Sequence, residues 1–229
     1  MWGRLATCGR LSIGQSPQAT FSGPITNRPQ VNNLPYMNRL GILISGRGSN
    51  FQAIADCIAA GELDACIAIV ISNQPGAAGL TLAWERHIPR LCIPSKDIPR
   101  EEYDSLLAQE LHAHEVDLVC LAGYMRLLSP GFIRAFENRI LNVHPSLLPS
   151  FPGLEAQAQA LRHGVKVTGC TVHFVTDEMD AGPIVMQAAV PVLDDDTESS
   201  LSKRILEQEH RIYSKAIGLV LSGRHRLRH

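Results

Sequence analysis

The stretch that decides the fold is residues 40–51, Leu-Gly-Ile-Leu-Ile-Ser-Gly-Arg-Gly-Ser-Asn-Phe. Its first five residues form a short apolar run, which is typical of a strand buried on both faces. Two glycines follow, and from Phe51 to Ala60 the apolar residues recur at helical spacing until Gly61. The stretch therefore predicts a buried strand, a tight glycine turn and a helix, which together begin an α/β fold.

The same alternation continues outward from this stretch to about residue 143. It predicts a mostly parallel, Rossmann-like sheet with helices on both faces. Ligands of such sheets bind beyond the carboxyl ends of the strands. The loops that follow strands, at 45–50, 123–128 and 142–150, are therefore the candidate binding loops. The predicted strands are 66–71, 88–93, 116–122 and 140–143, and the predicted helices are 80–86, 100–114 and 130–136.

The C-terminal third follows a different pattern. After a predicted helix at 154–163, two runs at 168–175 and 184–192 are rich in β-branched residues and are separated by an acidic loop that contains glycine. Such runs predict an antiparallel, hairpin-like addition to the sheet. Thr197 is a candidate N-cap for a final helix that ends at Gly223.

Composition and length agree with a single enzyme domain that acts on small-molecule substrates. The 229 residues carry 21 basic and 22 acidic side chains, for a net charge of −1, and they form no long basic stripe that would favour nucleic acid. No apolar run approaches the roughly eighteen residues that span a bilayer. The six cysteines form no C-x-x-C pair. We therefore expect reduced thiols in a cytoplasmic protein that binds neither membrane nor nucleic acid.

The first 38 residues differ from the rest of the chain. They contain Arg4, Arg10 and Arg28 among Ser, Thr, Gly and Pro, and no acidic residue precedes Asp56. This composition predicts a disordered extension before a catalytic domain at 39–223, which a basic tail at 224–229 follows. A transit peptide for an organelle and a start-site artefact are the alternatives.

Residues 142–150, Asn-Val-His-Pro-Ser-Leu-Leu-Pro-Ser, hold the strongest candidate for chemistry. Asn142 and His144 are two residues apart on a predicted strand, so both side chains point to one face. An amide and an imidazole placed there can stabilise a carbonyl oxygen that becomes an oxyanion. Ser146 lacks a G-x-S-x-G context, so we expect the acyl acceptor to be a second substrate. For His144 alone, a structural histidine is the alternative.

The glycine loop at 45–50 favours a phosphate monoester over a dinucleotide. Glycines at a helix N-terminus let the backbone amides approach an anion. The loop lacks the Gly-Lys-Ser/Thr of a P-loop, and Phe51 stands where a dinucleotide fingerprint has its third glycine. The segment 72–74 also offers no acid for an adenine ribose. A tight turn with Ser49 or Asn50 as helix cap is the alternative.

The segment 142–149, then Pro152-Gly153, and the segment 173–183 (His-Phe-Val-Thr-Asp-Glu-Met-Asp-Ala-Gly-Pro) resemble the folate-dependent formyltransferase family. The resemblance covers about 39–223. It is closest to members that transfer a formyl group from 10-formyltetrahydrofolate to the amine of glycinamide ribonucleotide in de novo purine biosynthesis. It implies direct attack by the amine, no metal, and a monomer or homodimer.

The resemblance also assigns roles to residues. It makes Asn142, His144 and Asp180 catalytic, with Asp180 orienting His144 and favouring its protonated form. It assigns the ribonucleotide phosphate to Gly48, Ser49 and Asn50, and the amine substrate to Glu209. For Arg100, a solvated charge in a first helical turn is the alternative. The residues that it assigns to the folate donor are Arg100, Met125, Arg126, Leu127, Leu128, Asn142, Thr176, Asp177, Glu178, Met179 and Asp180.

The chain departs from the family at one point. Glu155 and Gln157 stand where many relatives carry two histidines, and we place them at the start of a helix. We expect Glu155 to be dispensable for formyl transfer.

The alternative functions are a formyltetrahydrofolate hydrolase, a methionyl-tRNA formyltransferase, a nucleotide-binding oxidoreductase and a catalytically dead binding module. The first two usually carry a further domain, which we do not expect the segments before and after the predicted catalytic domain to supply. The third lacks its ribose-binding acid, and the intact Asn142, His144 and Asp180 argue against the fourth.

Overall fold

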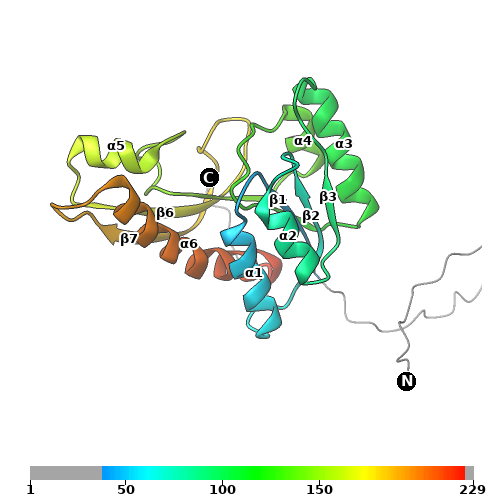
Figure 1. Cartoon of the computed structure of the whole chain (residues 1–229), viewed down its shortest axis with the longest axis horizontal. Helices are drawn as coiled ribbons and strands as arrows, with labels where there is room; N and C mark the ends of the chain where they lie inside the picture. The colour runs from blue at the N-terminus through cyan, green and yellow to red at the C-terminus, as the bar shows by residue number, and fades with distance from the viewer. Residues whose placement is uncertain (1–37, 225–229) are drawn as a thin grey trace, which may run out of the picture. The chain divides into compact units, whose positions relative to one another are not determined.

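The computed structural model describes residues 38–224, and these form one mixed seven-stranded sheet flanked by helices (Figure 1). The predicted fold class is confirmed. The strands are β1 (Arg39–Ile44), β2 (Cys66–Ser72), β3 (Arg90–Cys92), β4 (Leu118–Leu121), β5 (Ile140–His144), β6 (Val167–Phe174) and β7 (Ile184–Pro191). The helices are α1 (Ser49–Ala59), α2 (Ala78–Glu85), α3 (Arg100–Ala113), α4 (Pro130–Ala135), α5 (Ala156–His163) and α6 (Glu198–Leu221).

The strand order is β3-β2-β1-β4-β5-β6-β7. Strands β1 to β5 are parallel, whereas β6 and β7 are antiparallel additions, as the C-terminal pattern predicts. The chain runs outward from β1 to β3 and then returns to the other side of β1 as β4. The switch point of the sheet therefore lies between β1 and β4, where open α/β sheets bind their ligands. There the Ser45 amide donates to the Gly123 carbonyl at 3.1 Å.

Two apolar layers sandwich the sheet because successive strand residues point to opposite faces. Leu40, Ile42 and Ile44 belong to a cluster with α1 and α6, which includes the buried Phe51. Leu43 joins the other cluster, in which residues of α3 and α4 cover the second face. Helix α6 begins with the predicted N-cap Thr197, whose hydroxyl accepts from the Ser200 amide in a capping box.

Some element boundaries differ from the predicted ones. Strand β3 lies at the edge of the sheet and pairs only with β2. It has three residues because that pairing extends only from Arg90 to Cys92. Gly48, with a φ of 76°, is the N-cap of α1, so neither Ser49 nor Asn50 caps it. Helix α5 begins at Ala156 and not at residue 154, so Glu155 lies at the start of the helix, as predicted, but before its first turn. Glu155 is the N-cap of α5, with a left-handed φ of 55°, and its side chain makes no capping bond.

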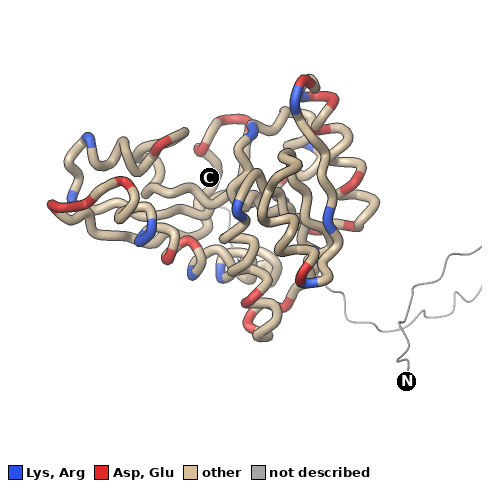
Figure 2. Tube along the Cα trace, in the orientation of Figure 1, with Lys and Arg blue, Asp and Glu red and all other residues tan. Residues whose placement is uncertain are grey.

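Basic and acidic side chains are interspersed over the described chain (Figure 2), as the near-balanced composition suggests. Between residues 38 and 224, no helix is long and apolar enough to cross a membrane. The five cysteines of this part of the chain are free thiols. Residues 1–37 and 225–229 lie outside the described residues, and so do the predicted disordered extension and most of the predicted basic tail.

Candidate active site

The polar centre of the site is built on the antiparallel pair β5–β6. Asn142 of β5 lies opposite His173 of β6, and His144 lies two residues further along β5. Directly opposed residues share a face of the sheet, as do residues two apart on one strand. All three side chains therefore converge on one side, and the Asn142 amide nitrogen lies 3.2 Å from His173 Nε2.

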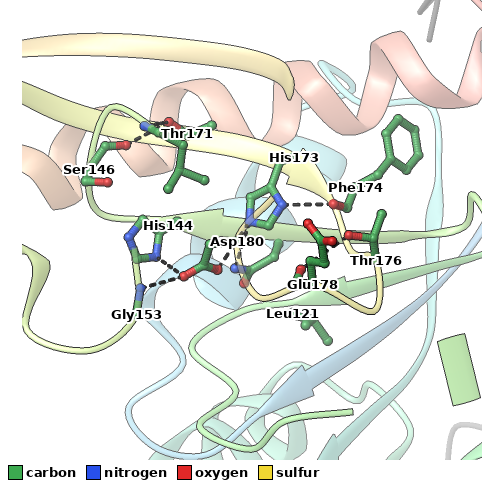
Figure 3. Close-up of polar contacts among 12 residues, drawn as sticks. Leu121, His144, Ser146, Gly153, Thr171, His173, Phe174, Thr176, Glu178 and Asp180 are labelled. Atoms are coloured by element: carbon green, nitrogen blue, oxygen red, sulfur yellow. Dashed lines mark hydrogen bonds and ion pairs between the residues drawn. The ribbon is translucent and has the colours of Figure 1, made fainter. Parts of the chain in front are cut away.

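Asp180 joins the two histidines from the loop between β6 and β7 (Figure 3). Its Oδ2 lies 3.4 Å from His144 Nδ1, and its Oδ1 lies 3.7 Å from His173 Nε2. Oδ2 also accepts a hydrogen bond from the Gly153 amide at 2.8 Å. The backbone of Asp180 is left-handed, with a φ of 53°, a conformation that aspartate tolerates better than most residues. The carboxylate is thus held between two imidazoles.

The His144 ring is buried and faces an oxygen acceptor on each side. Nδ1 faces the Asp180 carboxylate, and Nε2 lies 2.8 Å from the Phe151 carbonyl oxygen. Neither oxygen can donate, so only a ring that carries a proton on both nitrogens can donate to both. The surroundings of His144 therefore suit an imidazolium, which can stabilise a developing negative charge.

His173 is a site residue to which the sequence analysis assigned no role. Burial lowers its pKa, and the Phe174 carbonyl and the Asp180 charge oppose that shift only in part. In the neutral ring, Nδ1–H donates to the Phe174 carbonyl at 2.9 Å, and the bare Nε2 then accepts from Asn142. This bond holds the Asn142 amide in one orientation. The second hydrogen of that amide has no partner among the described residues.

Ser146 is not placed as a nucleophile. It is fully buried, and its hydroxyl donates to the Ser150 carbonyl at 2.5 Å. The site therefore offers polarising groups without a protein nucleophile.

At the start of α1, the backbone amides of Gly48 and Ser49 make no hydrogen bond with the described residues, as is usual in the first turn of a helix. A Cβ on Gly48 would lie 2.9 Å from the Gly79 backbone, and its φ is positive, so the turn requires glycine. The Asn50 side chain turns away from these amides, because its Nδ2 donates to Glu209 Oε2 at 2.7 Å. Burial raises the pKa of Glu209, and the bond from Asn50 lowers it to a smaller extent. Asn50 and the predicted amine-binding Glu209 are thus one buried pair.

The segment after β4 alternates between exposed and inward-facing side chains. Met125 and Leu127 are 72% and 59% exposed, whereas Leu128 is buried in the core. Arg126 is half-buried, and its guanidinium donates to the Ser95 and Ile98 carbonyls, both at 3.2 Å. Exposed apolar side chains next to backbone groups fit a planar aromatic ligand such as a pteridine.

The remaining predicted donor residues lie at the start of α3 and in the β6–β7 loop that carries Asp180. Arg100 is exposed at the first position of α3, beside Glu101 at 3.8 Å. In the β6–β7 loop, Met179 is 57% exposed, and the Thr176 hydroxyl donates to the Glu178 carbonyl at 3.3 Å. Asp177 belongs to the same loop and is exposed. Residues 38–224 hold no group of three or more His, Cys, Asp or Glu side chains placed for a metal ion.

A mixed α/β sheet with an Asn–His–Asp centre and a glycine turn at a helix N-terminus is the arrangement expected of a formyl transferase. The formyl transferase family matches residues 38–217, and the chain belongs to that family. Within it, the chain is 44% identical to phosphoribosylglycinamide formyltransferase of Escherichia coli over 184 residues, which are 80% of this chain and 87% of that protein. The resemblance inferred from the sequence motifs is confirmed.

Solved structures agree with this assignment. Glycinamide ribonucleotide transformylase 1 of Symbiobacterium toebii superposes with a TM-score of 0.83 at 52% identity, covering 87% of this chain and 96% of that one. A formyltetrahydrofolate deformylase of Pseudomonas syringae pv. tomato superposes with a TM-score of 0.80 at 29% identity, covering 85% and 64%. The fold is therefore common to a transferase and a deformylase.

A longer relative is also similar. The trifunctional purine biosynthetic protein adenosine-3 of Drosophila melanogaster is 49% identical over 188 residues, which are 81% of this chain. The matched part is 14% of that protein, so the chain corresponds to a small portion of the trifunctional relative.

Proposed function

We propose that the chain transfers the formyl group of 10-formyltetrahydrofolate to the amine of glycinamide ribonucleotide in purine biosynthesis. The observation that carries the proposal is the convergence of Asn142, His144 and Asp180 on one face of the sheet, together with a free-amide loop at Gly48 and Ser49. The names of two similar proteins supply the ribonucleotide acceptor, and the name of the similar deformylase supplies formyltetrahydrofolate as the donor. A phosphate at the loop would hold the ribonucleotide, with its amine directed toward the buried carboxylate of Glu209.

The chemistry that we infer needs no covalent enzyme intermediate. The amine nitrogen attacks the formyl carbon, and the carbonyl π electrons move to oxygen as the new C–N bond forms. The free amide hydrogen of Asn142 and the His144 ring stabilise that oxyanion. Each well-placed donor of this kind typically contributes about 3–4 kcal/mol. Collapse of the intermediate re-forms the carbonyl and breaks the bond to the folate nitrogen, which takes up the proton that the amine releases.

Asp180 has an electrostatic and an orienting role in this proposal. Its negative charge lies 3.4 Å from His144 Nδ1, and with the Phe151 carbonyl the carboxylate sets the plane of the ring. His144 Nε2 is bonded to the Phe151 carbonyl and cannot at the same time donate to the oxyanion. In this conformation the His144 ring therefore stabilises the oxyanion through its charge. A water held beside Asp180 would relay the amine proton to the leaving nitrogen.

The donor site that we propose combines apolar contact with a cation. The exposed Met125, Leu127 and Met179 suit the pteridine ring, and Arg100 suits the glutamate tail. Leu128, being buried, would contribute through its backbone. The loop residues Thr176, Asp177 and Glu178 would frame Asp180. We further propose a cytoplasmic protein that acts as a monomer or homodimer without a metal.

Tetrahydrofolate release, measured with and without glycinamide ribonucleotide, tests the proposal. We expect turnover to depend on the ribonucleotide, and the dephosphorylated ribonucleoside to serve only at a much higher concentration. Equal turnover without any amine would instead make the chain a deformylase and contradict the proposal.

A further inference from the structure

Side-chain hydrogen bonds join the loops at the carboxyl edge of the sheet into one chain. The Met125 amide donates to Ser45 Oγ at 2.8 Å, and the Ser45 hydroxyl donates to Asn73 Oδ1 at 2.7 Å. Asn73 Nδ2 then donates to Ser95 Oγ at 3.2 Å. The contacts run from the segment after β4, through the loops after β1 and β2, to the loop that precedes α3. The loops proposed to bind the two substrates are therefore mechanically linked.

Arg126 closes this chain of contacts. Its Nη1 donates to the Ser95 carbonyl and its Nη2 donates to the Ile98 carbonyl. Its guanidinium stacks 4.6 Å from the centre of the Tyr103 ring. Tyr103 is fully buried and is fixed by its own hydroxyl, which donates to the Ile93 carbonyl at 3.0 Å. The Arg126 side chain, between the exposed Met125 and Leu127 in the sequence, therefore points into the protein.

The hydrogen-bond partners of Arg126 lie close in sequence to the cation that we propose for the donor's tail. Ser95 and Ile98 belong to the short loop that leads into α3, whose first residue is Arg100. Arg126 itself lies in the segment proposed to hold the pteridine. A planar guanidinium can donate to two carbonyls at once, which an ammonium group on a flexible stem cannot reproduce with the same geometry. One side chain therefore sets the separation of two loops that would hold opposite ends of the donor.

We propose that Arg126 is a positioning residue for the formyl donor. It acts through the backbone of residues 125–128 and through Arg100, and it keeps the pteridine-binding segment and the tail-binding cation at the separation that one donor molecule requires. The proposal rests on the proposed function, because it takes the donor to be a folate with a glutamate tail.

The test compares two donors in four variants. The donors are 10-formyltetrahydrofolate and its analogue without the glutamate tail, and the variants are Arg126→Met, Arg126→Lys, Arg100→Met and the Arg100→Met/Arg126→Met double variant. Arg90→Lys is the control, because Arg90 also stacks on an aromatic ring, 4.3 Å from the centre of the exposed Trp84, but its side chain makes no hydrogen bond with these loops in the described part of the chain.

Arg126→Met should raise KM for the complete donor by about tenfold while kcat stays within about threefold, since remote positioning mainly affects binding. It should also reduce the preference for the donor that carries the tail, as Arg100→Met does. The double variant should be little worse than either single variant, because coupled residues are non-additive. Arg126→Lys should fall between wild type and Arg126→Met, and Arg90→Lys should match wild type.

A variant that lowers only the melting temperature, with KM and tail preference unchanged, would make Arg126 a purely structural residue and overturn the proposal. Additive effects of the two substitutions would overturn it as well. If Arg126→Met does not fold, Arg126→Lys takes its place. A reduced preference of that variant for the donor with the glutamate tail supports the proposal, and an unchanged preference overturns it. A wild-type chain that transfers no formyl group would reject the proposed function itself, whereas an active wild type with unaffected variants rejects only the role of Arg126.

Discussion

The parallel part of the sheet and the β5–β6 pair contribute different chemistry. Around β1, β2 and β4, the loops offer backbone amides and neutral side chains that bond to one another, as Ser45 and Asn73 do. On β5, β6 and the loop that follows β6, an amide, two imidazoles and a carboxylate face each other, with neighbouring groups 3.2 to 3.7 Å apart. The first arrangement suits the binding of remote groups, and the second suits the stabilisation of charge that develops in a reaction.

The two parts differ because of their strand directions. Parallel strands deliver loops and helix N-termini to one edge, where the amides at Gly48 and Ser49 are free. Antiparallel pairing instead places Asn142 directly opposite His173, side chain beside side chain. Changes in the β5–β6 centre should therefore lower kcat, whereas changes at the loops should raise KM.

The largest effect is expected for His144→Ala. The substitution removes the buried ring between Asp180 and Phe151 and should lower kcat by roughly 10²-fold or more, with KM values little changed. Steady-state kinetics with both substrates measure the split. His112→Ala is the matched control, since His112 is an exposed histidine in the last turn of α3. A kcat that falls less than about tenfold would remove His144 from the chemistry.

Asp180→Asn should come next, with a loss of kcat of roughly 10- to 10²-fold. Asparagine keeps the size of the side chain but carries no charge, so the His144 ring loses its charged neighbour at 3.4 Å. Steady-state kinetics with both substrates measure the loss, and a kcat within about threefold of wild type would show that the carboxylate is dispensable.

Glu209→Gln should act on binding and on the pH dependence of stability. It should raise KM for the ribonucleotide by about tenfold and leave kcat similar. Burial raises the pKa of Glu209 above the ordinary 4.5, so the folded state favours the protonated acid. Its contribution to stability is present below pH 4.5 and is lost as the pH rises through the raised pKa.

Melting temperatures of the wild type and of Glu209→Gln, measured between pH 4.5 and 8, therefore test whether the Glu209 carboxyl group titrates with a raised pKa. The wild type should lose stability over this range relative to Glu209→Gln, whose amide can still accept from Asn50. Parallel curves for the two proteins would show that the buried carboxylate does not titrate in this way.

The smallest effect is expected for Glu155→Gln. Glu155 caps α5 with a left-handed backbone, and its side chain has no hydrogen bond or ion pair with residues 38–224. The substitution should change kcat by less than about tenfold. A loss as large as that of Asp180→Asn, measured in the same assay, would place Glu155 in the catalytic centre.

The sequence predicts the fold well where local patterns decide it. The apolar run 40–44, the glycine turn and the cap at Thr197 are local signals, and the structure contains all three elements. The length of β3 depends on its pairing with β2, and the left-handed cap at Glu155 depends on the loop before it. Neither is visible in a local pattern.

The same distinction applies to the site. Asn142 and His144 could be placed on one face from their spacing alone, whereas the position of Asp180 came from the family resemblance. His173 received no role because its neighbour Asn142 is set by the β5–β6 register. The Asn50–Glu209 pair joins residues 159 positions apart, and the inward turn of Arg126 depends on Tyr103. Long-range contacts of this kind follow from packing rather than from periodicity.

Direct formyl transfer, the central claim, is tested by labelling both reacting atoms. The chain would be mixed with a donor that carries a ¹³C-formyl group and with glycinamide ribonucleotide that carries a ¹⁵N-amine, and the products followed by NMR. We predict a one-bond ¹³C–¹⁵N coupling in the product that grows in step with tetrahydrofolate release. Release of ¹³C-formate, with no coupled product, would contradict the account.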